Sequence, residues 1–166
     1  MSEEIEVPKK RPGFLTTLGV LSFVNIGFWF IMALLRMLSG PMSDEQILDQ
    51  KIVFAEAKNE LRKLGADSWT SLYDKLEAMT MQTNDSFYLA MFLEFVVLLI
   101  GLSGVIMMFK GRKFGFHVFI IYCLLSLGAA YLYISPSNIP TISTIFTVII
   151  SGLFIFLYSR NLRWMK

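Results

Sequence analysis

Residues Phe87–Phe109 read FYLAMFLEFVVLLIGLSGVIMMF, an apolar run of about 23 residues in which Glu94 is the only charge. About 20 such residues are enough for a helix to cross the hydrocarbon core of a bilayer. A carboxylate at that depth is costly to bury, and it marks a functional-site hypothesis. The run therefore predicts a membrane span, and the surroundings of Glu94 become the first question about function.

Three further apolar runs have the length of a span. The backbone of each is expected to be helical, because lipid offers no hydrogen-bond partner to free amides and carbonyls. We expect spans at 14–38, 87–109, 114–134 and 141–158, connecting segments at 39–86, 110–113 and 135–140, and terminal segments at 1–13 and 159–166. The composition agrees, since 55% of the 166 residues are hydrophobic. The predicted fold class is an all-α membrane protein with four transmembrane helices.

The basic residues form three clusters that fall on one side of such a four-span chain. They precede the first span (Lys9–Arg11), join the second and third (Lys110–Lys113) and follow the fourth (Arg160–Lys166). Positive clusters beside spans stay in the cytoplasm. Both termini are therefore predicted to be cytoplasmic, and segment 39–86, with nine acidic and five basic residues, extracytoplasmic. A net charge of only +2 gives no indication of nucleic-acid binding.

Segment 39–86 has the pattern of an αα-hairpin standing on the outer membrane face. Ser43 and Gln46 fit a capping box, and Gly65 suits a helix end, so helices are expected at 44–64 and 67–82. The expected packing residues are Leu61, Leu64, Leu72, Leu76 and Met79. Four residues are candidates for partner contacts, although the aromatic pair would by default fill the core of the hairpin: Trp69, Tyr73, Ile52 and Leu48.

Four polar residues inside the spans are the candidate functional residues. Glu94 shares a helix face with Ala90 and Gly101, so we expect it to face protein, either as a proton or cation site or as a structural residue. Arg36 ends the first span and would either pair with Glu94 or extend to the outer headgroups. Asn25 belongs to a polar seam of the first span, and His117 lies one turn inside the third, where packing or headgroup contact is expected.

Sequence motifs give no indication of catalysis. Cys123 is the single cysteine, so neither a disulfide nor a Cys-x-x-Cys redox pair can form within the chain. There is no zinc-protease motif, phosphate-binding loop or Gly-x-Ser-x-Gly elbow. We therefore expect a protein that is not an enzyme and has neither a cofactor nor a metal site.

The first span begins RPGFLTTLGVLSF, residues 11–23. This stretch resembles the start of a family of uncharacterised small four-span bacterial inner-membrane proteins, in which a basic stretch with proline runs into a Phe-Leu-Thr-rich first helix. The resemblance implies the inner membrane as location. It implies no activity and transfers no functional residue.

Three hypotheses for function remain open from the sequence. The first is a non-enzymatic accessory subunit of a larger inner-membrane complex, whose partners are the lipid bilayer and other integral membrane subunits. The second is a small transporter or ion-conducting homo-oligomer that uses Glu94 as a proton or cation site. The third is a lipid-acting membrane enzyme, which needs Glu94, His117 or tyrosine residues to converge in one cavity.

Overall fold

The computed structural model describes residues 13–165, and every regular element in this part of the chain is a helix. Four helical segments are long and apolar enough to span a membrane. These are α1 (Gly13–Ser39), α4 (Phe87–Phe109), α5 (Phe114–Gly128) with its 3-10 extension η1 (Ala129–Leu132), and α6 (Thr141–Ser159). The chain thus has the architecture of a multi-pass membrane protein, and Lys9, Lys10, Arg11 and Lys166 lie outside the described residues.

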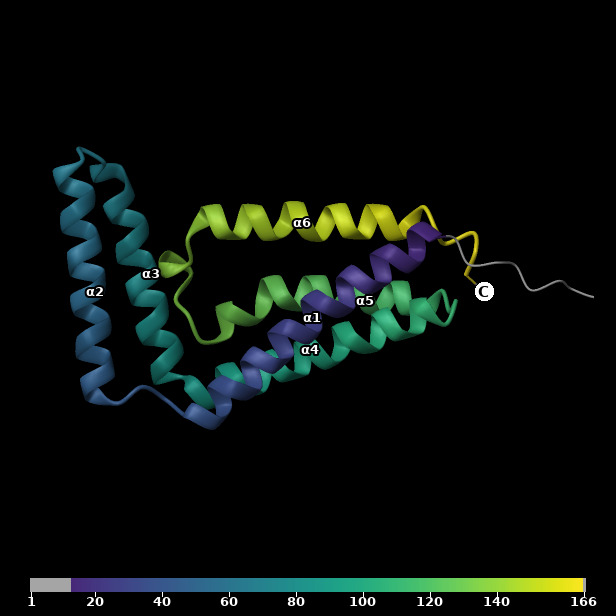
Figure 1. Ribbon diagram of the computed structural model, residues 1–166, viewed down its shortest axis with the longest axis horizontal. Coiled ribbons are helices and arrows are strands. Elements are labelled where there is room, and N and C mark those ends of the chain that lie inside the picture. The colour runs from purple at the N-terminus through teal and green to yellow at the C-terminus, as the bar shows by residue number, and fades with distance from the viewer. Residues whose placement is uncertain (1–12, 166) are drawn as a thin grey trace, which may run out of the picture.

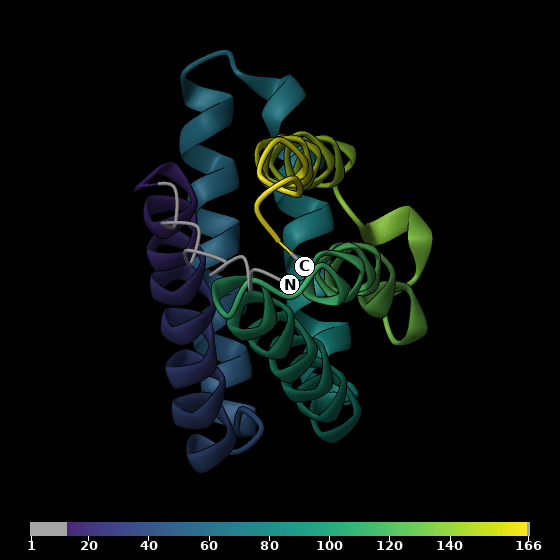
Figure 2. The ribbon, with the colours of Figure 1, turned by 90° about the vertical axis from the view of Figure 1, so that its right-hand side faces the viewer.

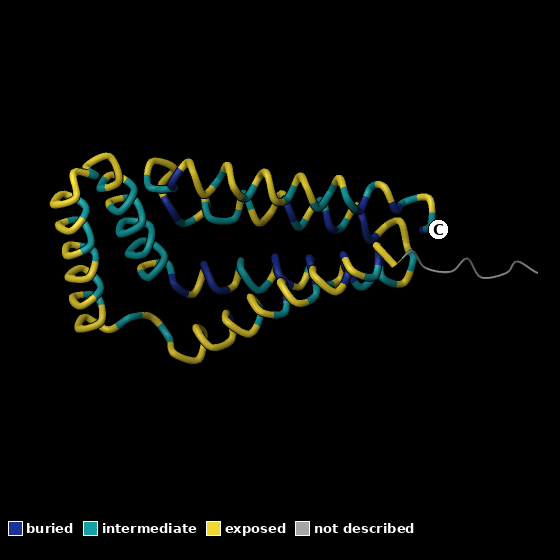
Figure 3. Tube along the Cα trace, turned by 45° about the horizontal axis from the view of Figure 1, so that its top comes forward, coloured by how far each residue is buried: buried dark blue, intermediate teal, exposed yellow. Residues whose placement is uncertain are grey.

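The four spans form an open bundle rather than a closed one. Helix α4 packs against α5 on one side and α1 on the other, while α6 rests mainly on α5 (Figures 1 and 2). Helix α6 meets α1 only near the chain termini, and the two helices diverge towards the opposite end (Figure 1). Most of α6 is therefore exposed (Figure 3).

The closest contact in the bundle is between α4 and α5, and glycines permit it. A Cβ atom added to Gly115 would lie 2.6 Å from the backbone nitrogen of Met108 and 2.7 Å from the carbonyl oxygen of Gly104. A Cβ atom on Gly104 would lie 3.0 Å from the backbone nitrogen of Phe119. The two backbones thus approach at a distance that only residues without a side chain allow.

Helices α2 (Asp44–Lys63) and α3 (Asp67–Asp85) lie side by side and cross the ends of the spans (Figure 1). Ser43 and Gln46 form the capping box at the start of α2, and Gly65 turns the chain at a φ of 70°. Helix α3 is anchored to the loop before α6, where the Gln82 side-chain oxygen accepts a 2.9 Å hydrogen bond from the backbone N–H of Ser135. The helix pair therefore lies across the bundle rather than standing on it.

The interior of the helix pair is small and partly polar. The rings of Phe54 and Tyr73 meet edge to face at 6.5 Å, and the Lys58 amine is 2.9 Å from carboxylate oxygens of both Asp74 and Glu77. The expectation that Leu64 packs here is wrong, because it lies at the end of α2 and is 79% exposed. The apolar stripe stops one turn earlier, at the half-buried Leu61.

We expect Leu61→Asp to loosen the helix pair, because it places an unpaired carboxylate against α3. Limited proteolysis of the purified protein should then cut segment 44–85 faster than in the wild type. Leu64→Asp is the matched control, since the same charge at that exposed position meets water. Equal protection of both variants would argue against packing through Leu61.

The two carboxylates beside Lys58 raise the pKa of its amine above 10.5, chiefly through the hydrogen bond to Asp74. A raised folded-state pKa contributes stability that is fully present below pH 10.5 and is lost as the pH rises through the folded value. We expect Lys58→Met to lower the thermal stability of the helix pair at pH 7, and this difference from wild type to shrink above pH 10.5. A difference that is larger at pH 11 than at pH 7 would contradict this.

Candidate functional site

Glu94 and Arg36 form an ion pair that joins α4 to α1. Glu94 lies two turns into α4, and Arg36 lies in the last turn of α1. The Arg36 guanidinium donates a hydrogen bond from Nη2 to Oε1 of Glu94. The Glu94 side chain is 25% exposed and that of Arg36 45%. Because Arg36 lies in the last turn of α1, the pair lies towards the end of the bundle next to the helix pair. Of the two arrangements left open for Arg36, the structure has the ion pair.

The surroundings of the pair are asymmetric along the bundle axis. A cavity of about 440 Å³ lies where the helix pair joins the spans, and Arg36 lines it together with polar residues Ser39, Gln46, Thr80, Thr83 and Asn84. Glu94 is not among its lining residues. Further along α4, towards the opposite end of the bundle, the side chains of Leu98, Val105 and Met108 are buried in the core. The polar cavity thus reaches Arg36. Between Glu94 and the opposite end of α4, the inward-facing side chains are apolar and packed.

Sequence reasoning placed Glu94 and the glycines on one helix face, and the structure divides that face between two neighbours. Ala90 is 2% exposed, and Gly101 would bring a Cβ atom to 2.6 Å from the ring of Tyr122 on α5. Glu94 instead reaches α1. Gly101 therefore serves contact with α5, and the carboxylate of Glu94 serves contact with α1.

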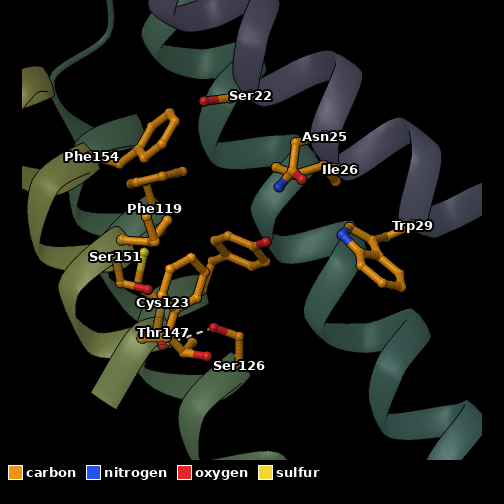
Figure 4. Close-up of a pocket in the computed structure, with 13 residues that line it drawn as sticks. Ser22, Asn25, Ile26, Trp29, Phe119, Cys123, Ser126, Thr147, Ser151 and Phe154 are labelled. Atoms are coloured by element: carbon orange, nitrogen blue, oxygen red, sulfur yellow. Dashed lines mark hydrogen bonds between the residues drawn. The ribbon is translucent and has the colours of Figure 1, made fainter. Parts of the chain in front are cut away.

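A second site lies between α1, α5 and α6, where the spans diverge. It is a cavity of about 350 Å³, and residues at the midpoint of each of the three helical segments line it, namely Ile26, Cys123 and Ile150. Ser22, another lining residue, forms a buried 2.9 Å hydrogen bond with the hydroxyl of Tyr158 on α6. Figure 4 shows Asn25 and Trp29 beside it on α1, with Thr147 and Ser151 opposite on α6.

The polar groups of this cavity differ in whether they have partners. Ser126 donates a 2.9 Å hydrogen bond to the Cys123 carbonyl, and Thr147 donates one of the same length to the Ser143 carbonyl. The Asn25 amide and the Trp29 indole N–H form no hydrogen bond with any of residues 13–165. Both side chains are exposed. Tyr122 also lines the cavity, and its hydroxyl likewise forms no hydrogen bond with any of residues 13–165, so three unpaired hydrogen-bonding side chains lie beside one cavity.

The remaining candidate residues do not join either site. His117 is exposed near the start of α5, with its ring at the edge of Phe116. It lies roughly 18 Å along the bundle axis from Glu94, judged from the helical rise. The two residues therefore do not meet in one cavity, and among residues 13–165 there is also no group of three His, Cys, Asp or Glu side chains able to hold a metal.

The four partner-contact candidates occupy different parts of the helix pair. Tyr73 packs on Phe54 inside it, whereas Trp69 is 51% exposed and lines a cavity facing the start of α6. The default expectation, that both aromatic side chains fill the core of the pair, thus holds for Tyr73 only. Leu48 and Ile52 are exposed on α2, one turn apart. These two residues form what we call the α2 apolar patch.

Comparison of the chain with protein-family models, with curated proteins and with solved structures gives no match. The functional inference therefore depends on the geometry.

In chemical terms, the Arg36–Glu94 pair can hold two spans together, and the 350 Å³ cavity can accept a small hydrogen-bonding molecule. The sequence did not reveal that Ser126, Thr147 and Ser151 line one cavity with Asn25. The available signal was that all four lie near the middle of a span.

Proposed function

We propose that this protein is a non-enzymatic accessory subunit of a larger inner-membrane complex. The observation that carries the proposal is the ion pair between Arg36 and Glu94. It engages the carboxylate on which the transport hypothesis depends, and it does so within the chain. A carboxylate held by an arginine of its own chain has to release that partner before it can bind an ion, so the pairing favours a structural role over transport.

The exposed part of the helix pair supports an interaction role. Leu48 is 60% exposed and Ile52 48%, on a surface otherwise rich in charged residues. Trp69 is exposed near the start of α6, where a partner inside the membrane or at its surface could reach it. Exposed apolar residues outside the spans are costly in water and favour a contact surface. The α2 apolar patch is thus the proposed partner surface.

Purification in mild detergent followed by mass spectrometry tests the proposal. Defined membrane subunits should co-purify with the wild type and be lost from the double variant Leu48→Ser/Ile52→Ser. Leu64→Ser is the matched control, because it removes an even more exposed leucine just past the far end of α2. A chain that purifies alone, or a subunit set that is identical in all three proteins, would contradict the role of the patch.

Orientation in the membrane is part of the proposal. The basic residues Lys110, Arg112, Lys113, Arg160 and Arg163 gather at the end of the bundle opposite the helix pair (Figure 1). We therefore place this end in the cytoplasm and the helix pair outside. In otherwise cysteine-free protein, a membrane-impermeant thiol reagent added to intact cells should label a cysteine at the exposed position 51 of α2 and spare one at position 112. The reverse labelling would overturn the orientation.

A further inference from the structure

The 350 Å³ cavity between α1, α5 and α6 lies midway along the spans, far from either end of them, and opens sideways past the exposed Trp29 and Phe146. Ile26, Cys123 and Ile150 line it, and each is the middle residue of its segment. At a rise of about 1.5 Å per residue, this places the cavity roughly 14–20 Å from the ends of these spans. Phosphate and glycerol groups of membrane lipids stay at the interfaces, outside a hydrocarbon core about 30 Å thick. A lipid that hydrogen-bonds to the residues of this cavity must therefore have a polar head that can enter the bilayer interior.

The lining of the cavity defines the chemistry of such a head. None of its thirteen lining residues is charged, so a charged head has no counter-ion there. The Asn25 amide and the Trp29 indole N–H are unpaired donors within residues 13–165, which favours a ligand with acceptor oxygens. Four of the other lining residues are aromatic, namely Phe119, Tyr122, Phe146 and Phe154. They favour a flat ring, which can stack or meet an aromatic edge.

The size of the cavity separates a small ligand from a partner helix. Sites for small molecules enclose about 300–1,000 Å³ and are mostly apolar with a few placed polar groups, as this one is. An α-helix is about 10 Å across, so 350 Å³ holds only about one turn of it. A helix could enter only if α1 and α6 moved apart, and the buried Ser22–Tyr158 hydrogen bond holds them together at one end.

We propose that this cavity binds an uncharged quinone-type lipid, meaning a flat ring with carbonyl oxygens and an apolar tail. The ring carbonyls accept hydrogen bonds from Asn25 and Trp29, and the ring packs among the aromatic side chains. The tail leaves on the side between α1 and α6, whose axes diverge towards the helix pair (Figure 1). The proposal concerns binding alone, and it stands independently of the accessory-subunit role.

Photo-crosslinking tests the proposal on the full-length protein in lipid nanodiscs. The probe is an azido-quinone with a ten-carbon tail, and the labelled residues are mapped by mass spectrometry. We expect labels on α1, α5 and α6 around the cavity, removed by excess decylubiquinone but not by decanol, which shares the tail and lacks the ring. Labels spread evenly over all four spans, or equal competition by decanol, would overturn the proposal, because the probe would then only be dissolved in lipid.

Variants test the residues that define the site. Asn25→Leu removes the amide, and Ser151→Leu fills the cavity from α6. Both should lower the competable labelling about tenfold, while Asn25→Gln keeps most of it. Ser103→Leu is the matched control, since Ser103 is exposed on α4 and bonds only the carbonyl of Ile100. Unfolding of Asn25→Leu, checked by circular dichroism, leaves Ser151→Leu to decide.

Unchanged labelling in Ser151→Leu would overturn the proposal. So would loss of a co-purifying membrane protein from Asn25→Leu while quinone labelling persists, since the cavity would then receive a partner's side chain.

Discussion

Gly115→Ala should destabilise the protein more than the addition of a methyl group at any other glycine in the spans. The new Cβ atom would lie 2.6 Å from the Met108 nitrogen and 2.7 Å from the Gly104 carbonyl oxygen, and both are backbone atoms. No side-chain rotation relieves these contacts, so α4 and α5 must separate along a tightly packed interface. Overpacking of a rigid core costs about 1–3 kcal/mol or more, and we expect the upper part of that range.

The glycines of this chain provide their own controls. Gly152→Ala on α6 adds the same methyl group where no atom lies within 4 Å, so it should leave stability unchanged or slightly raised. The stability of Gly19→Ala should lie between those of the other two variants. Its Cβ atom would meet the ring of Phe109 at 2.7 Å, and this ring can rotate away. Thermal unfolding of the purified variants in one detergent gives the order. A Gly115→Ala protein that melts together with Gly152→Ala would contradict the close approach of α4 and α5.

The four apolar helices could be predicted from sequence because their signal is local. An apolar run such as Phe87–Phe109 has to form backbone hydrogen bonds within itself, so its length and composition are enough. The capping box at Ser43 and the turn at Gly65 are local as well, and both are present. The prediction failed at Leu64, because this residue continues the periodic stripe but lies just past the end of α2 and is exposed.

The arrangement of the spans could not be predicted in the same way. The sequence indicated that Ala90, Gly101 and Glu94 face protein, but not that the glycines meet α5 while Glu94 meets α1. In lipid, most faces of a span are apolar whether or not they touch protein, so hydrophobic periodicity does not mark the partner. For the same reason the divergence of α6 from α1, and the cavity that results, left no mark in the sequence beyond polar residues near the middle of three spans.

Replacement of Arg36 should cost more stability than replacement of Glu94. Glu94 has a short side chain two turns inside α4 and is 25% exposed, so without Arg36 its carboxylate lies unpaired in apolar surroundings. Arg36 is 45% exposed in the last turn of α1, and without Glu94 its long side chain can extend to the headgroups. Breaking a fully buried pair costs about 3–5 kcal/mol, and exposure of this one reduces the expected loss in Arg36→Leu to roughly 1–3 kcal/mol.

Glu94 variants separate the structural role from transport. Glu94→Gln should stay folded and in its complex, because the amide oxygen still accepts the hydrogen bond from Arg36, whereas Glu94→Leu should weaken assembly. Lys63→Leu is the control, since its pair with Glu60 is at least 66% exposed on both sides and should contribute little. The transport hypothesis predicts a different pattern, in which Glu94→Gln assembles normally but loses a pH-dependent flux. Purified wild type and Glu94→Gln reconstituted in liposomes with a pH-sensitive dye decide between them, and proton or cation flux that depends on Glu94 would overturn the accessory-subunit role.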